Sequence, residues 1–501
     1  MPPRKRAAQD RHAMTDTTTA PANRTRWVAL IVLLVAQFMN LIDVTIVNVA
    51  LPSMQEAFGA SNSQIQWVVA GYILCFALLL LPAGRLGDIL GRRQMFVAGV
   101  AVFTVGSALC GMAPSIESLI AARLFQAVGA AMMTPQTLAF VPTLFSPQER
   151  GAAFALTGLT SGLAAVTGPI LGGWLVESNF IDLGWRPIFL VNIPVGLIAI
   201  AAGLRYLPRL APAPGKGLDL IGTLLAGIAL FCIIFPLIEG REMGWPAWCF
   251  AMMAASLPVA GLFALWLRRQ AAGGGAQIIP VSLFGNRAFA LGTLLSAMLF
   301  SAIPGFFLVL ALFLQIGHGL TPLQSGLTTV AFSVGVLIAS AASGRLGPRW
   351  PRQRIAAGAL MMAAAMIWLR LVVQGTGEEV VILAFSPPLL LAGIGLGASI
   401  SPLFQTILAG VPMADTGAAS GGLQAFQQMG GAVGVAIMGE MFFATLGPAL
   451  ASATPPHQAY GSALSYAVVY GAFSFGIIAA LVWLMPRLSA TAQPSPIPVE
   501  T

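Results

Sequence analysis

The feature that most constrains this chain is a series of long apolar stretches that recur at nearly regular intervals. A membrane-crossing helix needs about 20 mostly apolar residues. Of the 501 residues, 57% are hydrophobic and only 8% are charged, roughly a third of the charge of an average soluble domain. We therefore predict fourteen spans, at 27–51, 65–83, 95–113, 116–143, 151–175, 187–207, 218–239, 247–268, 288–317, 323–343, 353–373, 380–405, 416–447 and 464–487.

These spans are predicted to be helices. In lipid the backbone must satisfy its own hydrogen bonds, which leaves helices or a closed barrel. A barrel would show an alternation of polar and apolar residues that these segments lack. The expected fold class is an all-α polytopic membrane protein.

The basic residues predict the orientation. With the N-terminus in the cytoplasm, 21 of the 25 Lys and Arg residues fall in the tails and loops of the cytoplasmic side and three fall outside, as the positive-inside rule requires. We predict a multi-pass protein of the inner (plasma) membrane with both termini in the cytoplasm. This bias explains the net charge of +8, so the charge does not indicate a nucleic-acid partner.

A short charged motif occurs twice and predicts an internal repeat. Residues 84–93 read GRLGDILGRR, and residues 344–349 read GRLGPR. Matching the copies pairs the second span with the tenth. The predicted division is a disordered cytoplasmic tail at 1–26, a six-helix bundle at 27–207, linkers and two extra spans at 208–287, a second six-helix bundle at 288–487 and a cytoplasmic tail at 488–501.

The first copy is predicted to be a gating loop between two spans. Its glycines permit a tight turn and close helix approach, and its acid can pair with an arginine or lie at a helix N-terminus. Such a cluster can latch one conformation, whereas the simpler alternative is a basic loop that only sets topology. The residues concerned are Gly84, Gly87, Asp88, Gly91, Arg92 and Arg93.

Asp43 lies in the middle of the first span. A charged residue at that depth costs several kcal/mol on insertion scales, so it normally faces protein or water and has a function. Asn40 lies three residues earlier on the same helical face, and we place it in the substrate cavity. The simpler alternative is that Asp43 only binds a neighbouring helix.

The fourth span contains Arg123 and Gln126, which share a face because they are three residues apart. A permanent cation there is either the structural partner of an acid or a group whose field helps a nearby carboxyl group to release its proton. The two roles are compatible, and we place Gln126 in the substrate cavity.

The fifth span contains Gly168, Pro169, Gly172 and Gly173. Small residues allow close packing against another span, and the proline bends the helix. A plain packing face is part of the functional reading rather than an alternative to it.

The second half contains fewer buried charges. Gln424, Gln427 and Gln428 share one face of the thirteenth span, and Glu440 follows toward its outer end. We place these glutamines and Met133 in the substrate cavity and treat Glu440 as a second protonation site. Ordinary packing for Met133 and a solvated helix-end carboxylate for Glu440 are the alternatives.

Together these motifs resemble the major facilitator superfamily, and specifically its fourteen-span drug/proton antiporter family of the EmrB/QacA type. The resemblance covers about residues 27–487 and rests on residues 41–52, residues 84–93, the fourth-span motif with Gly129, and the glycine motif of the fifth span. That last motif departs in one place, because Ala164 stands where the family has glycine.

The resemblance implies two pseudo-symmetric six-helix bundles around a cavity that opens to alternate sides. It further implies proton-coupled export of drugs or other lipophilic small molecules, with Asp43 carrying the proton and Arg123 tuning its release. The expected partners are protons, a small-molecule substrate, the lipid bilayer and, as an open alternative, an adaptor with an outer-membrane channel. The protein is expected to be a monomer.

Other function classes fit less well. No Gly-x-x-x-x-Gly-Lys-Ser/Thr loop is present, which argues against an ATP-driven pump. The three histidines lie in the tail and at loops or span ends, so neither an intramembrane metalloenzyme nor a cofactor is predicted. A dedicated exporter or a proton-coupled importer of one metabolite, and a non-transporting receptor on the same scaffold, remain as alternatives.

Overall fold

The computed structural model describes residues 23–486 except 146–148, 180–181, 210–216, 276, 278–279, 347–349, 409–410 and 412–415. The predicted tails lie almost wholly outside the described residues. The helices are α1 (Asn23–Phe58), α2 (Asn62–Leu90), α3 (Arg92–Gly111), α4 (Ile116–Leu144), α5 (Arg150–Glu177), α6 (Pro187–Leu190), α7 (Asn192–Tyr206), α8 (Leu220–Glu239), α9 (Ala247–Ala272), α10 (Val281–Gly285), α11 (Arg287–Leu312), α12 (Pro322–Leu346), α13 (Pro351–Gln374), α14 (Ile382–Leu408), α15 (Thr416–Ala451) and α16 (Pro456–Leu481).

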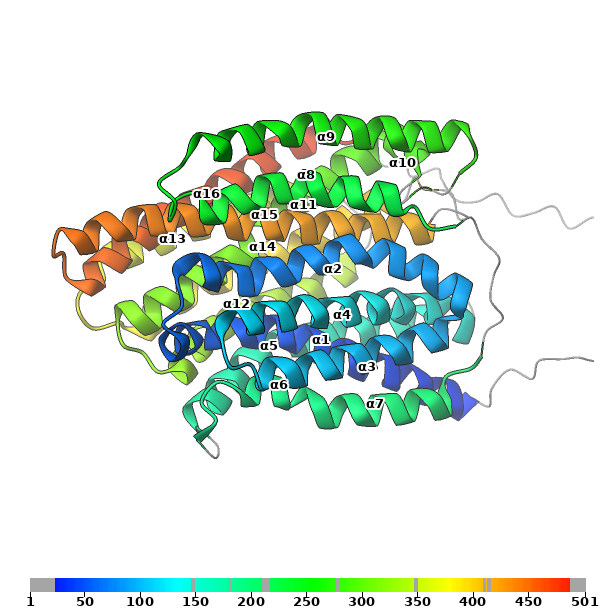
Figure 1. The fold of residues 1–501 in the computed structure, drawn as a ribbon, viewed down its shortest axis with the longest axis horizontal. Helices are drawn as coiled ribbons and strands as arrows, with labels where there is room; N and C mark the ends of the chain where they lie inside the picture. Colours follow the sequence, from blue (N-terminus) through cyan, green and yellow to red (C-terminus); the bar gives the residue numbers. More distant parts are fainter. Residues whose placement is uncertain are drawn as a thin grey trace, which may run out of the picture.

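The long helices run back and forth along one axis of the molecule (Figure 1). We call the end at which α1 begins the terminal end, on the right in Figure 1, and the opposite end, at which α1 ends and α2 begins, the distal end. A five-residue π-helix, Phe313–Gly317, continues α11, and a short 3₁₀ turn, Val482–Leu484, continues α16.

Thirteen helices among the described residues are long and apolar enough to cross a membrane. The predicted span at 151–175 falls on α5, whose apolar helical segment Gly162–Glu177 is shorter than that limit. The all-helical membrane fold is thus confirmed, and the count of fourteen stays a prediction.

The helices form two groups. Helices α1, α2, α3, α4, α5 and α7 pack among themselves, and so do α11 to α16. The groups meet along two seams, α2 against α15 and α5 against α12. The remaining long pair, α8 and α9, pack on each other, and α8 also contacts both α2 and α15. In Figure 1, α9 lies at the edge of the bundle.

Two glycines bring α3 and α4 unusually close together. A methyl group on Gly106 of α3 would lie 2.7 Å from the Cα atom of Gln126. One on Gly129 of α4 would meet the backbone of Phe103. Because neither position can hold a side chain without moving a backbone, these glycines set the distance at which polar groups of the two helices face each other.

Candidate functional site

A buried ion pair lies at the centre of the first helix group. Asp43 of α1 is fully buried and Arg123 of α4 is 2% exposed. Arg123 Nη1 donates to Asp43 Oδ2 at 2.5 Å and also to Gln126 Oε1 at 2.6 Å. Gln126 Nε2 in turn donates to Asp43 Oδ1 at 2.8 Å. The structure therefore brings together three residues that the sequence analysis singled out on two separate helices.

Two further polar residues, which the sequence analysis did not select, complete the site. Asn192, the first residue of α7, donates from Nδ2 to Asp43 Oδ1 at 3.0 Å and to Ser107 Oγ at 3.2 Å. Ser107 of α3 also accepts from Gln126 Nε2 at 2.8 Å. Both side chains are buried. We call Asp43, Arg123, Gln126, Asn192 and Ser107 the Asp43 cluster.

Aromatic rings surround the cation of this cluster. The Arg123 Cζ atom lies 4.0 Å from the centre of the Tyr72 ring and 5.6 Å from that of Phe189. Such contacts favour a desolvated guanidinium. The Tyr72 hydroxyl donates to Asn40 Oδ1 at 2.7 Å, so the structure places Asn40 beside the cluster as a partner of Tyr72.

The hydrogen bonds around Asp43 match an ionised carboxylate. A carboxylate is acceptor-only, whereas a protonated carboxyl group must donate one hydrogen. Arg123, Gln126 and Asn192 all donate to Asp43. Adding a proton to Asp43 therefore removes its negative charge beside a permanent cation and conflicts with at least one of these donors. The cluster joins side chains of α1, α3, α4 and α7.

The glycine motif of α5 packs against two different helices. A methyl group on Gly172 would lie 2.6 Å from Ile46 Cγ1, and one on Gly168 would meet Thr45, both on α1. Gly173 faces the other way, where a methyl group would lie 2.5 Å from the Cα atom of Leu323 on α12. The carbonyl of Pro169 packs against Gly326 of that same helix. The motif thus joins α1 to the seam between the helix groups.

We expect Gly173→Ala to lower the thermal unfolding midpoint of the purified protein, because its methyl group would meet α12 backbone atoms that cannot rotate away. The matched control is Gly261→Ala in α9, where a methyl group would meet nothing within 4 Å. That change should be neutral or stabilise by up to about 1 kcal/mol through helix propensity. Equal midpoints for both variants would contradict the role of Gly173 at the seam.

Within residues 84–93 the turn is shorter than the sequence predicted. α2 continues to Leu90, so Gly84 and Gly87 are helical, and Gly91, with φ of 99°, makes the turn into α3. Gly87 allows α2 to cross α4, since a methyl group there would meet the side chain of Gln136. The second span was predicted to end at residue 83, where the charged residues begin. The helix continues beyond that point because charged side chains at a membrane surface can reach water from a helix.

The charged side chains of this segment fasten α2 and α3 to neighbouring helices. Arg92 donates from Nε and Nη2 to Asp88 Oδ1, both at 3.2 Å, and from Nη1 to the Ala139 carbonyl of α4 at 2.7 Å. Arg93 donates to the Leu204 carbonyl of α7. These partners all belong to the first helix group, so a latch between conformations stays a prediction. The second copy of the motif ends at 347–349, outside the described residues.

The glutamines predicted for the cavity lie apart from the Asp43 cluster. Gln427 is buried and donates to Ser296 Oγ of α11 at 3.1 Å, while Gln424 and Gln428 are half-buried. Within the described part of the chain, no hydrogen bond joins them to the cluster. Met133 is fully buried, and its backbone packs against Gly99 of α3.

Glu440 has a partner that the sequence analysis did not foresee. Its Oε2 lies 3.3 Å from Arg241 Nε in the turn between α8 and α9, at the distal end. The structure therefore separates Glu440 from Asp43 and joins it to the two extra helices. Its assignment as a protonation site stays a prediction.

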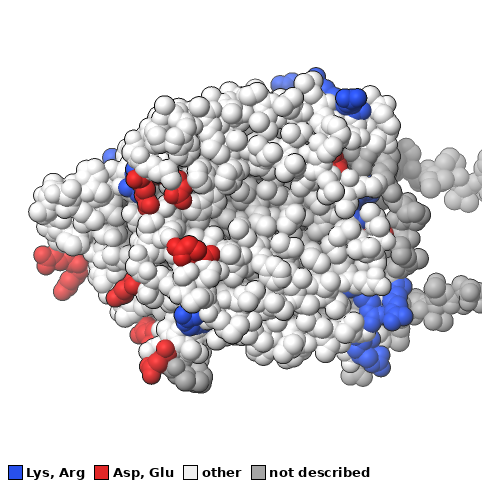
Figure 2. All heavy atoms as spheres, in the orientation of Figure 1, with Lys and Arg blue, Asp and Glu red and all other residues white. Residues whose placement is uncertain are grey.

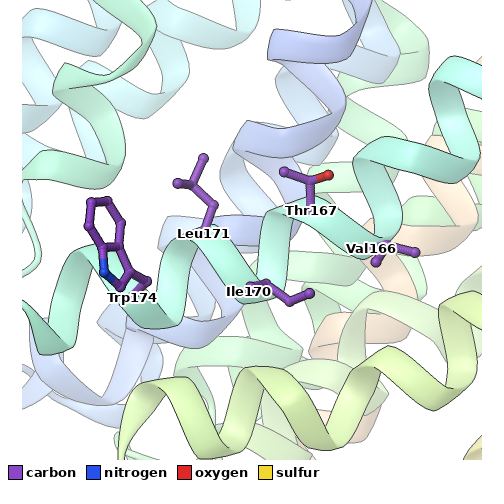
Figure 3. Close-up of a pocket in the computed structure, with 5 residues that line it drawn as sticks. All are labelled: Val166, Thr167, Ile170, Leu171 and Trp174. Carbon is purple, nitrogen blue, oxygen red and sulfur yellow. The ribbon is translucent and has the colours of Figure 1, made fainter.

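A cavity of about 340 Å³ lies along α5 (Figure 3). Its lining consists of Val166, Thr167, Ile170, Leu171 and Trp174. All five come from one helix and none belongs to the Asp43 cluster. We give it no part in the mechanism, because a mostly apolar groove without convergent polar groups does not fix a ligand.

Comparison with known proteins identifies the relatives of this chain. Residues 33–435 match the family described as Major Facilitator Superfamily. A probable actinorhodin transporter of Streptomyces coelicolor is 40% identical over 85% of this chain and 74% of that protein. A puromycin resistance protein of Streptomyces alboniger is 34% identical over 92% of this chain and 91% of that protein.

Solved structures support the fold alone. A bacterial homolog of the human lysosomal transporter Spinster, in an inward-facing and unoccupied conformation, superimposes with a TM-score of 0.64 at 19% identity. The match covers 93% of this chain and 97% of that one. An identity this low carries no inference about substrate or mechanism.

Proposed function

Because this chain belongs to the major facilitator superfamily, we propose that it is a proton-coupled antiporter that exports drugs or other lipophilic small molecules by alternating access. Relatives named for actinorhodin transport and puromycin resistance support the substrate class. The observation that carries the coupling is the buried Asp43–Arg123 pair, in which a single carboxylate accepts from three side chains. The fourteen-span EmrB/QacA subtype belongs to the same proposal.

The surface charges support the orientation proposed for this antiporter. Figure 2 shows acidic side chains gathered toward the distal end and basic ones mostly toward the terminal end. Basic residues favour the cytoplasmic side. The terminal end then faces the cytoplasm, and the distal end faces the outside of the plasma membrane. An adaptor and outer-membrane channel are not needed for this scheme.

The proposed cycle uses Asp43 as the proton carrier. Asp43 takes a proton from the outside, loses its attraction to Arg123, and releases the proton inside when the cation returns to the carboxylate. Substrate uses the opposite stroke. Each proton that enters supplies about 2.3 kcal/mol per 100 mV of membrane potential and about 1.4 kcal/mol per pH unit. In this cycle the proton is carried by Asp43 alone. Access is governed by Asp88, Arg92 and the glycine motif of α5 at the seam with α12.

The test uses purified full-length protein in proteoliposomes that contain a pH-sensitive dye. Puromycin is the first compound to add, because a relative is named for resistance to it, followed by a panel of lipophilic cations. Under an imposed proton gradient, a transported compound should speed the dissipation of the gradient compared with vesicles lacking protein. The proposal would be overturned if the compound entered the vesicles at the same rate with and without a proton gradient and if no protons moved. Proton and substrate movement in the same direction would indicate an importer.

A further inference from the structure

The turn between α8 and α9, residues 240–246, contains hydrogen bonds within its own backbone. Gly244 N donates to the Arg241 carbonyl at 3.1 Å, and Trp245 N donates to the Gly240 carbonyl at 2.7 Å. Gly244 and Trp245 have φ of 74° and 55°, so the chain reverses sharply here. These bonds define the path of the backbone from which the side chains of the turn extend.

Two carboxylates fasten this pair of helices to α2. Glu242 accepts from Ser63 N and from Ser63 Oγ, both at 3.0 Å. Glu239, the last residue of α8, accepts from Trp67 Nε1 at 2.8 Å. Ser63 lies in the first turn of α2, where backbone N–H groups lack helical partners and a negative charge is favourable. The link to α2 thus has three hydrogen bonds to charged acceptors, which are the stronger kind.

Arg241 links the same turn to α15, in the other helix group. Its Nε lies 3.3 Å from Glu440 Oε2, and its Cζ lies 5.3 Å from the centre of the Phe443 ring. In the described chain this Nε has no aligned hydrogen-bond partner. Charge attraction and the ring contact therefore hold the link to α15, which is the weaker of the two.

The seam that this turn crosses is closed at the distal end. Gln66 of α2 is buried, and a methyl group on Gly439 of α15 would meet its side chain. A movement that separates α2 from α15 at this end must also break one of the two links of the turn.

We propose that the α8–α9 turn is a clasp on the distal gate, which stays on α2 and releases α15 by breaking the Arg241–Glu440 pair. The inference rests on the proposed function, since alternating access is what requires this seam to open. Contacts present in one state only bias the equilibrium toward that state, so the clasp favours the closed distal gate. It gives the two extra helices a role, and it makes Glu440 a gate residue.

Distances between spin labels across the distal end test the clasp. The labels are attached through Met112→Cys in the first group and Leu450→Cys on α15, both exposed positions. The distance between them is measured in the full-length protein, in which the four native cysteines are replaced by alanine. We expect Arg241→Glu to move the distance distribution to longer values, and Arg241→Glu with Glu440→Arg to restore it. Arg241→Gln, a milder change if the reversal fails to fold, should give a smaller shift.

The control is Arg370→Glu, an exposed arginine near the distal end of α13, which should leave the distribution unchanged. An unchanged distribution in Arg241→Glu, or a double variant that stays at long distance, would overturn the clasp. The same proteins in proteoliposomes separate the two proposals. If the distances shift but the protein moves no protons with substrate, only the antiporter proposal is contradicted. If the distances stay the same in a protein that is an active antiporter, only the clasp proposal is contradicted.

Discussion

Asp43→Asn is expected to reduce substrate-driven proton movement in proteoliposomes to the rate of vesicles without protein. Asparagine has nearly the same size and keeps an oxygen that accepts from Arg123, but it cannot take up or release a proton. Exchange of substrate across the membrane without a proton gradient should persist, because the neutral amide imitates the protonated carboxyl group. The two assays together distinguish lost coupling from lost binding.

A suitable control is Glu56→Gln, which removes an exposed carboxylate from the distal end of the same helix. It should retain proton movement, because a solvated carboxylate lies outside the Asp43 cluster. Should Asp43→Asn keep substrate-dependent proton movement, the proton carrier lies elsewhere, and Glu440 becomes the next carboxylate to replace. Loss of both exchange and proton movement in Asp43→Asn would point to substrate binding instead.

Much of the Asp43 cluster could be predicted from the sequence because burying a charge is costly. Asp43 and Arg123 interrupt long apolar segments, and a charge in such a place needs a partner. Gln126 followed from helical spacing, since it lies on the face of Arg123. The ion pair and the Gln126 bond to Asp43 therefore agree with the cost of burial and with helix geometry.

Ser107 and Asn192 could not be found in this way. Serine is common in membrane helices as a packing residue, so Ser107 carries no signal of its own. Asn192 is the first residue of α7 and falls inside the predicted span 187–207, for which the sequence indicated no site residue. Its position against Asp43 depends on how α7 packs on α1 and α3, which no local pattern encodes. An asparagine inside an apolar run was the available signal.

The α8–α9 turn shows the same limit at the other end of the molecule. Its charged residues Arg241 and Glu242, together with Glu239 at the end of the span before it, read as the ordinary polar end and loop between two spans. Their partners Ser63 and Glu440 are far away in the chain. A charged side chain on a loop in water costs little free energy. Composition alone therefore does not distinguish a solvated loop from one that bridges two helix groups.

Arg123→Met is expected to destabilise the folded protein by about 3–5 kcal/mol, the usual cost of removing one partner from a buried ion pair. Asp43 is fully buried, so its charge would lose the cation while remaining out of water. Methionine preserves length and apolar contact with Tyr72 and Phe189, so the loss reports charge rather than a cavity. Thermal unfolding of the detergent-purified protein provides the measurement.

The decisive comparison is Arg123→Met with and without Asp43→Asn. If the cost comes from an unpaired carboxylate, the second change should return part of the lost stability, because a neutral amide at position 43 needs no cation. Arg205→Met, at an exposed position on α7, is the control and should cost little. Additive losses in the double variant would mean that Arg123 stabilises α4 by packing alone. The Asp43–Arg123 pair would then be too weakly coupled to pass the energy of a proton to the helices around it.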